Sequence, residues 1–178
     1  MDFNSERLIS KNIYIPHTNE GNESKDLNFN DNEQENEEDI QTNLIYTWGF
    51  SKYGQTGHDN ANYIISPTII NFSQLLNSDQ FSYNIDIEPA AGESHSALLI
   101  QDLENSYLYM FGKNIFGQLG IEDNSYIYDP ILIRGVFQKE RVNKISLGGE
   151  HSLILTENNN IYSCGLNIFG QLGTGDFE

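Results

Sequence analysis

The residues best suited to chemistry in this sequence are two His-Ser pairs. His95-Ser96 and His151-Ser152 each lie in the pattern Gly-x-x-His-Ser-x-x-Leu, and the two histidines are 56 residues apart. A histidine beside a serine could supply a base and a nucleophile. However, adjacent residues of a strand point to opposite faces, so neither pair can share a proton without a third group. We expect both histidines to be buried and to donate a hydrogen bond to a neighbouring backbone carbonyl.

The recurrence of the pair also favours a structural role. Gly92 and Gly148 open the two copies of the pattern. Active sites rarely repeat in each unit of a repetitive protein, whereas structural ties do. We therefore predict no catalytic residue and no enzymatic activity.

A glycine-rich loop, x-Gly-x-x-x-x-Gly-Gln-[Leu/Thr]-Gly, occurs three times. The copies begin at Gly49, Gly112 and Gly165, which are 63 and then 53 residues apart. A P-loop needs Gly-Lys-Ser or Gly-Lys-Thr at the start of a helix, and a dinucleotide-binding loop needs a strand-turn-helix; neither follows here. We interpret the glycines as residues with positive φ and the glutamines as hydrogen-bond partners of the loop backbone.

The residues assigned to the repeated structural motif fall into three loops and two His-Ser segments. They are Gly49, Gly54, Gln55, Gly57, Gly92, His95, Ser96, Gly112, Gly117, Gln118, Gly120, Gly148, His151, Ser152, Gly165, Gly170, Gln171 and Gly173.

Metal and cofactor sites are not predicted. The four histidines and one cysteine show no ligand spacing. Cys164 falls in a predicted strand where the sister copies carry Trp48 and Phe111. We expect a buried, reduced thiol at this position.

Charge and hydropathy restrict the partners. A formal net charge of -17 with only nine Lys and Arg residues argues against direct binding of nucleic acid, which needs clustered basic residues. No run reaches the roughly 18 apolar residues of a membrane span, and no signal peptide is visible. We expect an intracellular protein of the cytoplasm or nucleus.

Residues 1–42 form an Asn- and Glu-rich leader that we predict to be disordered. The stretch Asp31–Asp39 holds six acids and no base, and such a composition cannot bury enough apolar surface to fold. The leader either docks on a basic partner or serves only to solvate the chain, and composition favours the second reading. Residues 13–15 form a short strand or lie unstructured.

Strands are predicted most clearly near the carboxyl end: residues 142–147, 151–156 and 161–164. Asn158-Asn159-Asn160 fits a hairpin turn, because Asn tolerates left-handed backbone angles. The apolar runs 97–100 and 152–155 predict strands covered on both faces.

Prolines mark the remaining strands. We expect Pro67 and Pro130 to open edge strands, with residues 50–66 as a long loop before the first. Pro89 makes the innermost strand of its unit doubtful. Residues 71–84 are predicted to be irregular, with scattered apolar anchors.

The glycine loop, the edge strand with its proline and the Gly-x-x-His-Ser-x-x-Leu strand together resemble the repeat of the regulator of chromosome condensation family. The resemblance covers about residues 43–178. It implies an all-β fold, an incomplete β-propeller of four-stranded antiparallel blades with about two and a half repeats. The disordered acidic segment would precede it.

The resemblance implies two classes of function. The first is a non-catalytic protein-interaction module. The alternative is a guanine-nucleotide exchange factor, or regulator, of a Ran-like small GTPase, because the founding member of the family has that activity. No stretch here matches the protruding loop on which exchange depends, so the alternative rests on the shared fold.

Two further contacts are open at this point. The basic residues Arg134, Lys139, Arg141 and Lys144 form either a partner contact or a solvated strand entry. An incomplete ring also leaves blade faces uncovered, and we expect self-association through them or partial unfolding.

Overall fold

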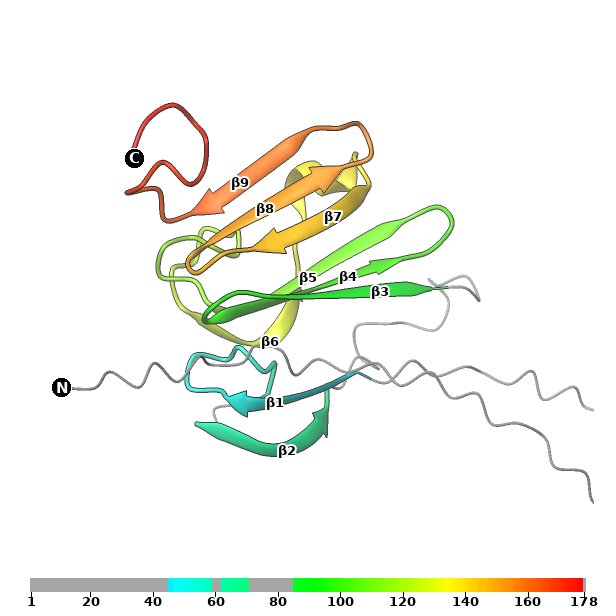
Figure 1. Cartoon of the computed structure of the whole chain (residues 1–178). Helices are drawn as coiled ribbons and strands as arrows, with labels where there is room; N and C mark the ends of the chain where they lie inside the picture. Colours follow the sequence, from blue (N-terminus) through cyan, green and yellow to red (C-terminus); the bar gives the residue numbers. More distant parts are fainter. Residues whose placement is uncertain (1–44, 59–61, 71–84, 178) are drawn as a thin grey trace, which may run out of the picture.

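The computed structural model describes residues 45–58, 62–70 and 85–177. Three antiparallel sheets follow one another along the chain (Figure 1). Blade 1 contains β1 (Tyr46–Phe50) and β2 (Tyr63–Ile69). Blade 2 contains β3 (Asp86–Ala91), β4 (His95–Gln101), β5 (Ser106–Lys113) and β6 (Tyr126–Leu132), in that order across the sheet. Blade 3 contains β7 (Val142–Leu147), β8 (His151–Thr156) and β9 (Ile161–Gly165), after a 3-10 turn, η1 (Gly135–Gln138).

The predicted strands of blade 3 are confirmed, and so is the turn between β8 and β9. Asn159 has a φ of 63°, and its N–H donates to the carbonyl of Thr156. The Thr156 N–H donates in turn to the carbonyl of Asn160, which closes the hairpin.

The expectation that proline opens each edge strand is wrong. β2 and β6 begin four residues before Pro67 and Pro130, so residues 63–66 are strand and not loop. Both prolines lie where the pairing register shifts beside the glycine loop. A bulge on an edge strand requires no donor from proline, which explains why the strand continues through it.

The doubt about Pro89 is also resolved against the expectation. β3 pairs with β4 along its whole length, with Pro89 opposite Leu98. β3 is an edge of its sheet. The Gly92 N–H donates to the carbonyl of His95. Hydrogen-bonded and non-hydrogen-bonded pairs alternate along two antiparallel strands, so the backbone nitrogen of Pro89 points away from β4. The missing N–H therefore costs no ladder bond.

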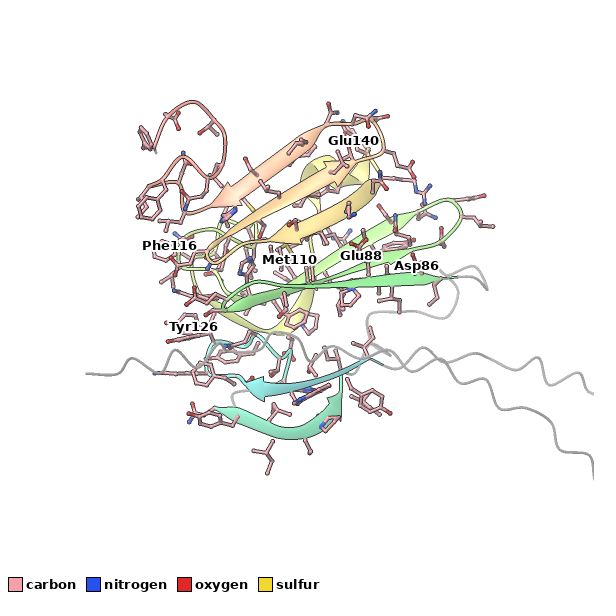
Figure 2. The ribbon with its side chains drawn as sticks, viewed as in Figure 1. Asp86, Glu88, Met110, Phe116, Tyr126 and Glu140 are labelled. Carbon is pink, nitrogen blue, oxygen red and sulfur yellow. The ribbon has the colours of Figure 1, made fainter. Side chains whose placement is uncertain are left out.

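The hydrophobic core lies between blades. One cluster joins Ile45 and Ile70 of blade 1 to Leu98 and Phe111 of blade 2. A second joins the opposite face of blade 2, including Met110, to blade 3. Figure 2 shows Met110 in the interior between these two sheets. Each sheet thus buries its apolar face against its neighbour.

The two His-Ser strands differ in burial. Residues 97–100 of β4 are fully buried, which confirms that this strand is covered on both faces. In β8, Ser152 and Ile154 are buried but Leu153 and Leu155 are only half-buried. The expectation of double coverage is therefore wrong for β8, because no described residue packs as a further sheet on its outer face.

The space around the first glycine of each loop shows which strands lie beside it. Gly49, Gly112 and Gly165 all have φ near 110°. A Cβ at Gly112 would lie 2.6 Å from the carbonyl oxygen of Ser94, and one at Gly165 would lie 2.4 Å from that of Glu150. At Gly49 nothing described lies within 4 Å. Within the described residues, β1 therefore lacks the His-bearing strand that β5 and β9 have.

Several expectations fall on residues outside the described part of the chain. They are the disorder of residues 1–42, the short segment 13–15 and the irregular segment 71–84. In the described part, no helix is long and apolar enough to cross a bilayer.

Matched alanine substitutions test the role of the glycine contact. We expect Gly112→Ala to lower the free energy of unfolding by about 1–3 kcal/mol more than Gly49→Ala, because only the first forces a methyl group into backbone atoms. Because the two sites have similar φ, the conformational strain of alanine is similar in both variants and largely cancels in the comparison. Urea unfolding of both variants measures the difference, and equal costs would show that the contact is unimportant.

Candidate functional site

A buried hydrogen-bond chain crosses from blade 2 to blade 3. Nε2 of His95 lies 3.0 Å from Oγ of Ser152, and that hydroxyl donates over 2.7 Å to the backbone carbonyl of Gln118. His95, Ser152 and Gln118 are all fully buried. Because the serine proton is used by the carbonyl, the imidazole must donate from Nε2. We call this arrangement the blade tie.

The partner of His95 is not the backbone carbonyl that we expected from the sequence. Nε2 meets the hydroxyl of Ser152, which sequence reasoning missed, and Nδ1 has no hydrogen-bond partner in the described part of the chain. His151, which we also expected to be buried, is half-buried. The sequence pattern pairs His95 only with Ser96, its neighbour on the same strand. The serine one repeat further along the chain was the signal that could have revealed the contact.

The junction between blades 1 and 2 contains the same serine contact. Oγ of Ser96 donates to the carbonyl of Gln55 over 2.7 Å. Ser96 and Ser152 thus bind equivalent loop carbonyls in the preceding blade. Each His-Ser segment joins its own blade to the loop of the one before.

The glutamine side chains fix the three loops from within. Oε1 of Gln55 accepts from the N–H of Tyr53 at 3.0 Å, and Gln118 and Gln171 accept in the same way from Phe116 and Phe169. Gly54, Gly117 and Gly170, which follow the aromatic residues, have φ between 72° and 84°. Residues that carry a Cβ rarely adopt this backbone conformation. Each loop therefore holds one aromatic residue at its tip.

Aromatic side chains from blades 1 and 2 meet at this end of the sheets. Ring centroids lie 5.5 Å apart for Phe50–Tyr63, 5.7 Å for Phe50–Tyr53 and 5.0 Å for Tyr53–Tyr126. Figure 2 shows Phe116 and Tyr126 at the same end. We call this set the loop-end surface: Phe50, Tyr53, Tyr63, Phe116 and Tyr126, with Lys52 and Lys113.

The two lysines are directed at these rings. Nζ of Lys113 lies 5.1 Å from the ring centroid of Phe116 and 6.0 Å from that of Tyr53, and Nζ of Lys52 lies 5.8 Å from Tyr53. Lys113 also pairs with Glu150 of blade 3 at 2.6 Å. These cation–π contacts orient the side chains of the surface.

The basic residues singled out from the sequence do not behave alike. Arg141 donates to the carbonyl of Asp102 at 2.8 Å and pairs with Glu157 at 2.8 Å, so it braces blade 3 against the β4–β5 hairpin. Arg134, Lys139 and Lys144 are exposed.

Cys164 is half-buried rather than buried, because it lies on the open blade 3. Burial raises the pKa of its thiol to about 11, so the thiol is protonated near neutral pH and is a poor nucleophile. Within the described ranges, no group of three or more His, Cys, Asp or Glu side chains could hold a metal ion.

Burial lowers the pKa of His95 from 6.5 to about 4, and this effect outweighs the opposing influence of the His151 backbone. The folded chain therefore keeps this imidazole neutral, and the unfolded chain binds a proton below pH 6.5. Protonation favours the unfolded state, so stability is lost as pH falls through this window.

The pH dependence of unfolding tests the buried state of His95. From pH 7 to pH 4 we expect the free energy of unfolding to fall by about 3 kcal/mol on account of His95, since one pKa unit corresponds to about 1.4 kcal/mol. His95→Asn should flatten the profile between pH 4.5 and 6.5. Urea unfolding at several pH values gives both profiles, and identical slopes would contradict the buried neutral imidazole.

Comparison with known proteins gives two kinds of match. Family models of the regulator of chromosome condensation (RCC1) repeat match residues 105–155 and 142–171. The human X-linked retinitis pigmentosa GTPase regulator is 38% identical over 98 residues, which cover 55% of this chain and 9% of that protein. The Arabidopsis thaliana ultraviolet-B receptor UVR8 is 32% identical over 132 residues, covering 74% of this chain and 27% of the receptor.

The solved structure of Prp20p from Saccharomyces cerevisiae shows the same fold. It superposes with a TM-score of 0.60 at 24% identity and covers 76% of this chain and 32% of Prp20p. The chain spans less than a third of the length of each of these three proteins. The described sheets are therefore blades of an incomplete β-propeller, and the chain belongs to the RCC1 repeat family as a partial set of about two to three repeats.

Proposed function

We propose that the chain is a non-catalytic protein-interaction module whose loop-end surface binds a protein partner inside the cell, in the cytoplasm or the nucleus. The observation that carries the proposal is the group of aromatic rings at the loop end of blades 1 and 2. Tyr53 and Phe116 lie in the glycine loops, and the other rings come from the adjoining ends of β1, β2 and β6. Several of them are open to solvent.

The exposure and composition of the loop-end surface suit protein binding. Tyr63 is 66% exposed, Phe116 40% and Tyr126 39%. Aromatic residues are enriched in protein interfaces, where they bury large areas at low cost in side-chain entropy. The hydrogen bond that the Phe116 N–H donates to the side-chain oxygen of Gln118 also reduces the loop entropy lost on binding.

The state of the nucleophilic groups supports a role without catalysis. The hydroxyls of Ser96 and Ser152 donate to backbone carbonyls inside the blade junctions. The imidazole of His95 is buried and already donates to Ser152. None of these groups is free to attack a substrate, so we propose neither an enzymatic activity nor a cofactor.

Regulation of a small GTPase is the second candidate. The human relative is named a GTPase regulator, and the structure of Prp20p was described with its binding to Gsp1p and histones. This chain covers only a small part of each protein, so the partner class is carried here by the family resemblance alone. A Ran-like GTPase is accordingly one partner that the loop-end surface would bind.

Binding measurements with paired variants test the proposal. Phe116→Asp and Tyr126→Asp should each weaken binding to a protein partner at least tenfold, because a buried charge replaces an aromatic anchor. The immobilised chain, residues 1–178, would be tested against a Ran-type GTPase in its GDP-bound and nucleotide-free forms. Proteins retained from a cell extract would be quantified in parallel by mass spectrometry.

Leu103→Asp is the matched control. Leu103 is an exposed apolar residue in the hairpin between β4 and β5, at the opposite end of these strands from the loops. If all three variants bind a partner equally well, the loop-end surface is not its binding site and the proposal is wrong. If the chain releases labelled GDP from the GTPase faster than the intrinsic rate, it acts as an exchange factor and the proposed non-catalytic role is wrong.

A further inference from the structure

Ser66-Pro67 is the one place in the sequence where a serine or threonine directly precedes a proline. The four prolines follow Ile15, Ser66, Glu88 and Asp129. Proline has no backbone N–H, and its ring fixes φ. An enzyme that modifies a hydroxyl and contacts the next residue can therefore distinguish this serine from every other serine of the chain.

The backbone around Ser66 is extended but not paired. Ser66 lies in β2, which is an edge strand of blade 1. The pairing of β2 with β1 is interrupted between Ile64 and Thr68. Residues 65–67 therefore form a bulge that has no partner residues in β1. An active site can bind this segment without first breaking the pairing of the sheet.

The side chain of Ser66 is open to solvent. Ser66 and Pro67 are exposed, and the preceding Ile65 is 95% exposed. In the part of the chain that the structure describes, the hydroxyl of Ser66 forms no hydrogen bond, whereas its carbonyl accepts from Oγ1 of Thr68 at 2.9 Å. The hydroxyl of the buried Ser96, by contrast, donates to a backbone carbonyl. Ser66 thus offers a hydroxyl that the fold does not use.

Blade 2 carries a negative charge at the same position of the repeat. The pairing of β5 with β6 places Asp129-Pro130 where the pairing of β1 with β2 places Ser66-Pro67. Asp129 is exposed, although the glycine loop of blade 1 packs against β6. The repeat therefore accommodates an anionic group at this position even beside a neighbouring blade. A phosphate on Ser66 would remain in water and carry no desolvation cost.

We propose that Ser66 is a phosphorylation site for a proline-directed serine/threonine protein kinase. The hydroxyl oxygen attacks the γ-phosphorus of ATP, the bond from that phosphorus to the bridging oxygen of ADP breaks, and ADP leaves. The hydroxyl proton passes to the catalytic aspartate of the kinase. Strand β2 has no charged residue, so the phosphate gives it the negative charge that Asp129 gives to β6.

Kinase assays on the folded chain test the proposal. Residues 1–178 and a peptide of residues 60–72 would be incubated with ATP, Mg²⁺ and purified kinases of the proline-directed class. Tandem mass spectrometry would locate the phosphate. We expect the folded chain to be phosphorylated at Ser66 at no less than about a tenth of the rate of the peptide, because the bulge is already accessible. Phosphorylation of the peptide alone, or of neither, would overturn the proposal.

Matched variants separate the effect of the proline from that of the fold. Pro67→Ala keeps the hydroxyl and should slow phosphorylation of Ser66 at least tenfold. In a chain that also carries Ser66→Ala, Asp129→Ser creates a Ser-Pro pair in the exposed bulge of β6 and should be phosphorylated. Glu88→Ser creates such a pair in β3, which is half-buried at this position and paired with β4 along its length, and should react at least tenfold more slowly than Asp129→Ser. Equal rates in either comparison would contradict the proposal.

Ser66→Asp tests whether the folded blade tolerates the charge. Because the equivalent Asp129 is exposed in a folded blade, we expect the urea midpoint of Ser66→Asp to equal that of the unmodified chain within error. A lower midpoint would show that a negative charge at Ser66 is incompatible with the fold, and would overturn the site.

Discussion

The hydroxyl of Ser152 is the point on which the arrangement of blades 2 and 3 depends. It accepts from His95 and donates to the Gln118 carbonyl, so it joins two sheets and one loop inside a region without solvent. Apolar contacts between sheets are not directional, whereas these bonds specify one registration of the blades. Removal of one partner would leave buried polar groups unsatisfied, at a cost of about 1–3 kcal/mol.

The blade tie also explains how a structural motif can support a surface. The carbonyl that accepts from Ser152 belongs to Gln118, whose side chain holds the backbone of Phe116. Blade packing and loop conformation therefore share one residue. The aromatic tip is positioned by the junction beneath it, and a partner that contacts the tip gains from order already present in the core.

The sequence pattern predicted the strands of blade 3 and the three glycine loops, because the residues that define them are close together in the chain. Residues 142–147 and the turn at Asn159 needed only alternation and backbone preference. The partner of His95 could not be read locally, since Ser152 lies 57 residues away and meets it only when two sheets stack. The half-burial of Leu153 was likewise invisible, because it depends on which neighbouring blade is present. The continuation of β2 through Pro67 depended on a bulge that a strand pattern does not reveal.

A double-mutant cycle between His95 and Ser152 tests the central claim most directly. The free energies of unfolding of His95→Ala, Ser152→Ala and the double variant would be measured in urea against the unmodified chain. If the two side chains stabilise the junction together, the double variant costs less than the sum of the single variants by about 1–2 kcal/mol. Strict additivity of the two costs would show that His95 and Ser152 do not stabilise the junction together, and would contradict the account.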